Sequence, residues 1–199
     1  MKTAQQITSA IALACLSASS HAAAVLYTTS ASFLTNVAAG SYIENFNGLA
    51  NPPSGAVAFS GGAFAYSAFA PSDIYLAGGF LGTNQINEAL TITFANGNVT
   101  ALGANFYATD ISDVFQAVSL SISLSDGTIE TFTPSTLSNS YRGFVSNIAI
   151  TSLILSGPGA SLYAGLDNLT VGMAAPEPAS WALSGVALAG LFVARRRKL

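Results

Sequence analysis

Only a few side chains of this 199-residue chain are suited to covalent or transition-metal chemistry. Cys15 is the sole cysteine and His21 is the sole histidine, and both lie near the N-terminus. If that stretch is an export leader that is removed, Cys–His and Ser–His–Asp catalysis lose their essential groups. Zinc, copper and haem sites lose their usual ligands in the same way. Lysine is also missing between Lys2 and Lys198, which excludes Schiff-base chemistry there.

The N-terminus has the three parts of a secretory leader. Lys2 supplies a positive charge, residues 7–16 (ITSAIALACL) form an apolar stretch, and small residues follow. We expect cleavage after Ala22 or Ala24 and interpret residues 1–24 as a signal peptide. The alternative, a buried helix of the domain, fits this order of charge, apolar stretch and small residues less well.

The central region is acidic. Between residues 25 and 174 it carries eight carboxylates against the single cation Arg142, a formal charge of −7. Binding to nucleic acid depends on lysine and arginine side chains that neutralise phosphates. We therefore exclude nucleic acid as a partner.

Carboxylates in this region are candidate ligands for a hard cation such as calcium, which prefers oxygen donors. Glu44 and Asp167 lie near the two ends of the region, on segments that we expect to be strands. The first and last strands of a jelly-roll module are often neighbours, so we predict a calcium site at Glu44 and Asp167, with Asn168 and Asp110 as weaker additions. Alternatively, Asp167 and Asn168 cap a turn, as Asp and Asn commonly do.

Two other sets of side chains give weaker functional hypotheses. Asp110 and Asp113 resemble the carboxylate pair of a glycoside hydrolase, but their spacing along the chain gives no measure of the separation that this chemistry requires. Tyr141 and Arg142 are candidate contacts for a bound glycan. A solvated acidic loop is the structural alternative for the two aspartates.

The elements that must position these residues are strands. Runs of apolar and β-branched residues predict strands at 91–94, 99–108, 118–125, 128–133 and 148–156. The dipeptides Asn-Gly and Asp-Gly tolerate positive φ and predict two hairpins, at residues 95–98 and 125–128. Residues 32–40 are the one plausible short helix, because they end at a glycine.

The spacing of these strands predicts an all-β domain at residues 25–174. Strands follow one another about every ten residues, and no repeat period is visible, so two packed sheets fit better than a propeller. We predict a jelly-roll-like antiparallel β-sandwich.

The C-terminus, residues 175–199, has a different composition. A Pro-Glu-Pro triplet precedes an uncharged, largely apolar run at residues 179–194 and a cluster of basic residues. We predict a short transmembrane helix whose basic end stays in the cytoplasm, following the positive-inside rule. The prolines cannot continue that helix upstream, so the triplet should be extended and accessible.

This arrangement resembles the PEP-CTERM sorting signal of Gram-negative bacteria over residues 176–199. The resemblance implies recognition by an exosortase, a membrane-embedded enzyme that removes the tail and passes the protein to the cell surface and its exopolysaccharide matrix. The residues of the predicted signal are Pro176, Glu177, Pro178, Arg195, Arg196 and Arg197. Segments 42–49 (YIENFNGL) and 164–172 (AGLDNLTVG) also resemble, more loosely, the ectodomains of other PEP-CTERM proteins.

We therefore predict a non-catalytic exported protein of the cell surface or of an exopolysaccharide or biofilm matrix. It would cross the inner membrane and be anchored there transiently by its C-terminal helix. The predicted partners are the exosortase and, as a candidate, exopolysaccharide. No cofactor is required, and calcium is the one candidate. The alternatives are a calcium-dependent carbohydrate-binding module and, less favoured, a carboxylate-based glycoside hydrolase.

Overall fold

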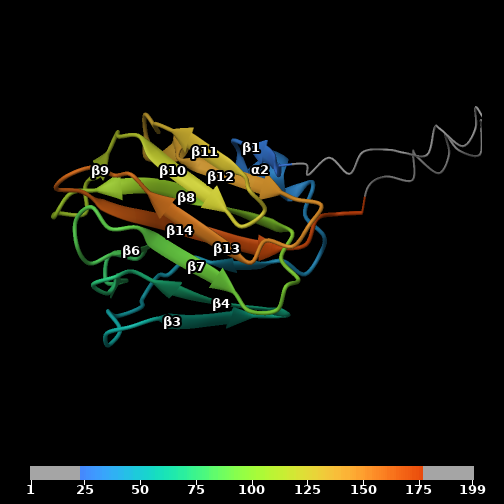
Figure 1. Ribbon diagram of the computed structural model, residues 1–199, viewed down its shortest axis with the longest axis horizontal. Coiled ribbons are helices and arrows are strands. Elements are labelled where there is room, and N and C mark those ends of the chain that lie inside the picture. The colour runs from blue at the N-terminus through green and yellow to red at the C-terminus, as the bar shows by residue number, and fades with distance from the viewer. Residues whose placement is uncertain (1–22, 177–199) are drawn as a thin grey trace, which may run out of the picture.

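The computed structural model describes residues 23–176, which form two antiparallel sheets packed face to face (Figure 1). This confirms the predicted jelly-roll-like antiparallel β-sandwich. The predicted signal peptide, apart from its last two residues, and the predicted transmembrane helix lie outside the described residues.

One sheet has eight strands, in the order β1-β12-β8-β14-β6-β5, with β2 also paired to β14 and β9 paired to β8. These strands are β1 (Val25–Tyr27), β2 (Tyr42–Glu44), β5 (Ile74–Tyr75), β6 (Leu81–Thr83), β8 (Ala101–Thr109), β9 (Phe115–Gln116), β12 (Tyr141–Val145) and β14 (Tyr163–Gly172). The long strands β8 and β14 pair at the centre of this sheet.

The other sheet has six strands, in the order β11-β10-β13-β7-β4-β3. These strands are β3 (Val57–Gly61), β4 (Phe64–Phe69), β7 (Leu90–Phe94), β10 (Leu120–Leu124), β11 (Ile129–Phe132) and β13 (Ser152–Ser156). Buried and more exposed residues alternate along β7, β10 and β13, so one side of each strand is buried and the other faces outward.

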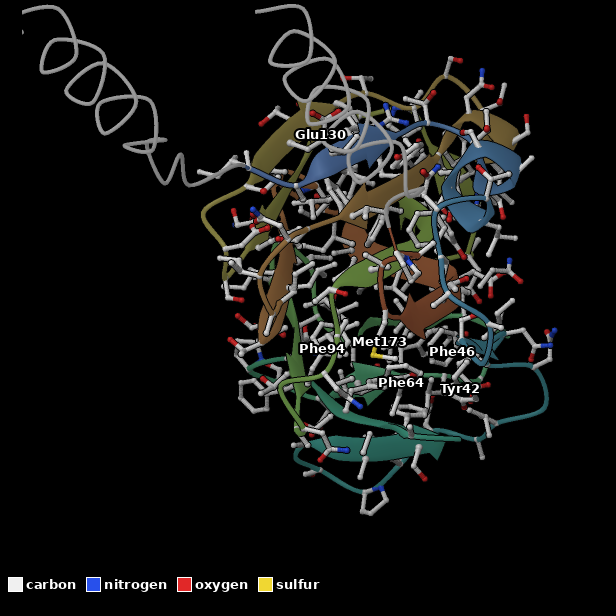
Figure 2. All side chains as sticks on the ribbon, turned by 90° about the vertical axis from the view of Figure 1, so that its right-hand side faces the viewer. Tyr42, Phe46, Phe64, Phe94, Glu130 and Met173 are labelled. Atoms are coloured by element: carbon white, nitrogen blue, oxygen red, sulfur yellow. The ribbon has the colours of Figure 1, made fainter. Side chains whose placement is uncertain are left out.

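One continuous core lies between the sheets. Its largest side chains are aromatic or branched aliphatic, and they include Phe46, Phe64, Tyr66, Phe94, Phe106, Phe144, Leu166 and Leu169. Figure 2 shows Tyr42, Phe46, Phe64 and Phe94 between the two layers and Glu130 near the opposite edge of the sandwich. Burying these apolar faces is the main stabilising contribution, at about 25 cal/mol per Å².

The two predicted hairpins have different outcomes. Asp126 and Gly127 connect β10 to β11, which pair antiparallel, so that hairpin is confirmed. The Asn96–Gly97 hairpin is wrong, because β7 and β8 belong to different sheets. The turn instead docks on the β3–β4 connection: Asn96 and Asn98 both donate to the carbonyl of Ala63, at 3.3 and 2.9 Å. The chain therefore crosses between sheets here.

The predicted helix at 32–40 is shorter and starts earlier. The α-helix α2 spans Ser30–Leu34, and Thr29 caps its N-terminus by accepting from the backbone of Ser32. The rest of the predicted segment does not continue the helix because residues 36–38 bond instead to the last strand segment of the domain. The second helical element, the 3₁₀ turn η1, spans Leu137–Asn139.

Two side chains close the long edges of the sandwich. At one edge the Tyr42 ring lies flat against Gly61 of the opposing sheet, where a Cβ atom would overlap the ring. At the other edge the Arg142 guanidinium lies 3.8 Å from the centre of the Phe132 ring and 3.3 Å from the Glu130 carboxylate. These contacts join the eight-stranded sheet to the edge strands of the six-stranded sheet.

Candidate functional site

The end of the folded domain is held to the segment that follows α2. Ala38 donates to the carbonyl of Met173 and Ala175 donates to the carbonyl of Asn36, both at 2.8 Å. Ala174 also donates to the Thr100 hydroxyl at 2.8 Å. We call these contacts the terminal clamp.

The exposed Pro176 follows the terminal clamp directly. In Figure 1 the described chain ends on the right-hand side of the sandwich, toward the end that carries α2 and β1. The predicted triplet therefore begins one residue after the last clamped amide, with no linker between them.

The strands that carry the predicted calcium ligands are neighbours, because β2 pairs with β14. Glu44 lies opposite Leu169, a core residue, so its side chain is on the inner face of the sheet. Asp167 follows the core residue Leu166 and is on the outer face. A register shift between Asp167 and Thr170 separates the two positions. The two carboxylates thus point to opposite faces of one sheet.

Both carboxylates already accept hydrogen bonds from residues that are close to them in sequence. Glu44 accepts from the Tyr42 hydroxyl and from the backbone of Phe46 at 3.1 Å. Burial, and then the hydrogen bond to Glu44, raise the pKa of Tyr42 to about 12. Asp167 accepts from the backbone and side-chain amides of Asn168, at 2.6 and 2.9 Å.

Burial raises the pKa of Asp167, and the backbone hydrogen bond from Asn168 opposes that rise. Residues 23–176 contain no group of three or more acidic, histidine or cysteine side chains arranged to hold a metal ion. The calcium site at Glu44 and Asp167 stays a prediction, and the register does not support it.

We expect full-length protein to melt at the same temperature in EDTA and in millimolar calcium. We also expect Asp167→Asn to be neutral or stabilising at neutral pH. The folded pKa of Asp167 is raised, so stability falls as pH rises above the unfolded value of about 3.9 and stays lower at neutral pH. Asparagine keeps an acceptor oxygen for the backbone of Asn168, loses the acceptor for its side chain, and removes this penalty.

The measurement is a pair of thermal melts of each protein. A true site would add about 2.7 kcal/mol at a hundredfold excess of calcium over its dissociation constant. A calcium-dependent rise in the midpoint that Asp167→Asn abolishes would establish the predicted site.

Tyr141 and Arg142, the two residues predicted to contact a glycan, pack against other residues of the domain. Tyr141 is 5% exposed, and its ring packs on Phe33 of α2 with a centroid distance of 6.1 Å. The Arg142 side chain is 13% exposed and is paired with Glu130 at the sandwich edge. Neither side chain is available to a glycan.

A cleft of about 90 Å³ lies on the outer face of the eight-stranded sheet. Its lining includes Tyr75, Phe80, Asn84, Thr109, Asp113 and Tyr163. Phe80 packs over Gly82 and Gly165, and its ring centre is 5.5 Å from that of Tyr75. The cross-strand pair Tyr163 and Thr109 continues this face. No sequence pattern predicted the cleft, although the run Gly78–Gly82 (GGFLG) marks a place where an aromatic ring packs on glycine backbone.

The two aspartates considered for hydrolysis both line this cleft, but only one is available. Asp110 Oδ1 accepts from the backbones of Ser112 and Val114, at 2.9 and 3.1 Å, and its Oδ2 accepts from Gln116 at 2.9 Å. Its carboxylate therefore holds the 110–116 loop together. Asp113 accepts from the Tyr75 hydroxyl at 2.7 Å. Hydrolysis requires two available carboxylates, so this arrangement does not support it.

A family model for the PEP-CTERM protein-sorting motif matches residues 174–198. The chain therefore carries a PEP-CTERM sorting motif at its C-terminal end. No curated protein and no solved structure matches it. The match begins within the terminal clamp, so the PEP-CTERM motif and the last paired residues of the domain overlap at Ala174 and Ala175.

Most of the PEP-CTERM motif lies beyond the described structure. Pro176 is described and exposed, whereas Glu177, Pro178, Arg195, Arg196 and Arg197 lie outside the described residues. Within residues 23–176, no helix has the length and apolar character needed to cross a bilayer. The recognition of the motif from its residues is confirmed.

Proposed function

We propose that this chain is a non-catalytic protein of the cell surface or extracellular matrix, delivered there by an exosortase. The sorting motif at residues 174–198 is the observation that carries this proposal. The protein would be exported through the inner membrane, anchored transiently by residues 179–194, and then released or transferred. Exopolysaccharide of the matrix is its proposed environment.

The composition of the described domain supports a role without catalysis. Residues 23–176 contain no cysteine, histidine or lysine. Arg142 is paired with Glu130, and Asp110 is bound within its own loop. The described domain therefore acts as a scaffold that presents its outer faces and loops to its surroundings.

The terminal clamp suggests where processing must occur. Cleavage before Ala174 would remove the hydrogen bonds of Ala174 and Ala175 to Thr100 and Asn36. Cleavage at or after Pro176 leaves the whole fold intact. We therefore infer that the tail is cut at or just after the triplet.

The experiment is intact-mass measurement of the protein recovered from the extracellular or surface fraction. We expect a species that begins at residue 23 or 25, ends near residues 176–178, and lacks Arg195–Lys198. A double variant, Pro176→Ala with Pro178→Ala, should retain the complete tail and stay in the membrane fraction. Full-length tail on surface-located wild-type protein would contradict the proposal.

A further inference from the structure

The cleft on the outer face of the eight-stranded sheet has an unusual charge for a binding site. Asp113 and Asp110 line it, and no basic side chain does. Arg142 is the only lysine, arginine or histidine between residues 23 and 176. It lies on the inner face of the eight-stranded sheet, where it pairs with Glu130 of β11 in the other sheet. The negative charge of the cleft therefore has no compensating cation in the described domain.

The described residues hydrogen-bond to only one of the two carboxylate oxygens of Asp113. Its backbone has a φ of 60°, a left-handed conformation that aspartate adopts only occasionally. Its Oδ2 accepts from the Tyr75 hydroxyl. No residue among 23–176 donates to its Oδ1, so the carboxylate keeps acceptor capacity for a ligand.

Thr109 presents a second polar group to the cleft. The residue is 2% exposed and lines the cleft, yet none of the described residues hydrogen-bonds to its hydroxyl. The hydroxyl is not among the fully buried side-chain atoms that lack a partner, so it is open to the space of the cleft and can bond to a group placed there. The neighbouring Thr83 differs, since its hydroxyl donates to Gln85 and accepts from Ala164.

Three of the other lining residues are aromatic. Tyr75, Phe80 and Tyr163 contribute rings whose negative faces attract cations. A cavity holds one water in roughly 10–15 Å³, so the cleft has room for a small head group. A ligand group that is both cationic and a hydrogen-bond donor fits this lining. It would meet the aromatic rings, the Oδ1 atom of Asp113 and the hydroxyl of Thr109.

We propose that this cleft binds a protonated primary amine, carried either by an amino sugar or by a simple amino alcohol. The ammonium group would donate to Asp113 Oδ1 and to the Thr109 hydroxyl, with the aromatic side chains around it. Carboxylate and phosphate ligands are disfavoured by the negative lining. This binding activity goes beyond surface display and does not depend on where the protein is located.

Isothermal titration of the full-length chain in a neutral detergent tests the proposal with three probes. Glucosamine and ethanolamine, titrated below the pKa of their amines, are expected to bind and to bind more weakly as salt is added. N-acetylglucosamine keeps the ring without the charge and is expected not to bind. Tighter binding of glucosamine than of ethanolamine assigns the site to amino sugars, and equal binding assigns it to the amine alone.

Matched variants locate the interaction. Asp113→Asn keeps the size, the acceptor for Tyr75 and the tolerance of positive φ, and it should weaken binding about tenfold or more, as expected for a hydrogen bond between charged groups. Asp126→Asn makes the same change in net charge in the distant β10–β11 turn and should leave binding unchanged. Thr109→Val should also weaken binding.

Three results would each overturn the proposal: no binding of either amine, equal binding of N-acetylglucosamine, or binding that survives Asp113→Asn. Because none of these measurements concerns the C-terminal tail, their failure would leave the sorting proposal untouched.

Discussion

Raising the pH above about 10 is expected to unfold the domain, because its tyrosine phenols are held protonated by the fold. Burial raises the pKa of Tyr66, Tyr107 and Tyr141 above the usual tyrosine range. A hydrogen bond to Asp113 raises the pKa of Tyr75, and burial raises that of Tyr42 to about 12. Five phenols therefore titrate later in the folded than in the unfolded chain.

The sign of the effect follows from proton linkage. A phenol with a raised folded pKa stabilises the fold fully below the unfolded value near 10, and this contribution is lost as pH rises further. Each phenol that stays protonated costs about 1.4 kcal/mol for every pH unit above 10. Tyr66 and Tyr107 alone would remove about 3 kcal/mol per pH unit, a large share of a typical 5–15 kcal/mol.

The measurement follows phenolate absorbance and circular dichroism together as the pH is raised. We expect both to change in one cooperative transition. Tyr66→Phe is the matched control, because the Tyr66 hydroxyl is buried without a hydrogen-bond partner among the described residues. This variant should keep or raise stability at neutral pH and reduce the pH dependence. Phenols that titrate near pH 10 while the fold persists would contradict the argument.

The regular part of the fold could be predicted because its strands obey simple alternation. Residues 90–94 and 120–124 place apolar side chains at every second position, and both are strands. The Asp126–Gly127 turn joins residues 120–124 to the next strand, residues 129–132, and forms a hairpin. Asn96–Gly97 has similar local chemistry, but the strands on either side of it pair with other partners. A turn dipeptide determines that the chain reverses and leaves open which sheet it enters.

The candidate sites were harder to predict because they depend on which face a residue occupies. Leu166 and Leu169 both reach the core although they are three positions apart, because Asn168 adopts a φ of 54° at a bulge. The bulge moves Asp167 to the outer face, away from Glu44. That odd spacing, with an asparagine between, is a signal that sequence reasoning missed. The residues that line the cleft come from separate strands, two to ten residues long, and from a loop. No local sequence pattern links these segments.

The packing of α2 on β12 gives the second large expected effect. A Cβ atom on Gly143 would lie 2.6, 2.7 and 2.9 Å from three carbon atoms of Phe33. One of these is the Phe33 Cβ, which cannot move without the helix. Gly143→Ala should therefore push α2 off the sheet and cost about 1–3 kcal/mol, in the range of overpacked cores. Phe33→Ala should cost about 3–5 kcal/mol, because Phe33 is fully buried.

A double-mutant cycle separates this clash from a general effect of altering β12. Residues in direct contact are not additive, so Gly143→Ala with Phe33→Ala should cost less than the two single changes together. Denaturant unfolding of the four proteins provides the free energies, and additive costs would show that the ring is not what Gly143 accommodates. Because α2 leads into residues 36–38, its displacement should also loosen the terminal clamp. Hydrogen exchange at the amides of Ala38 and Ala175 should then accelerate in Gly143→Ala, which would link the packing of one glycine to the junction that precedes the sorting motif.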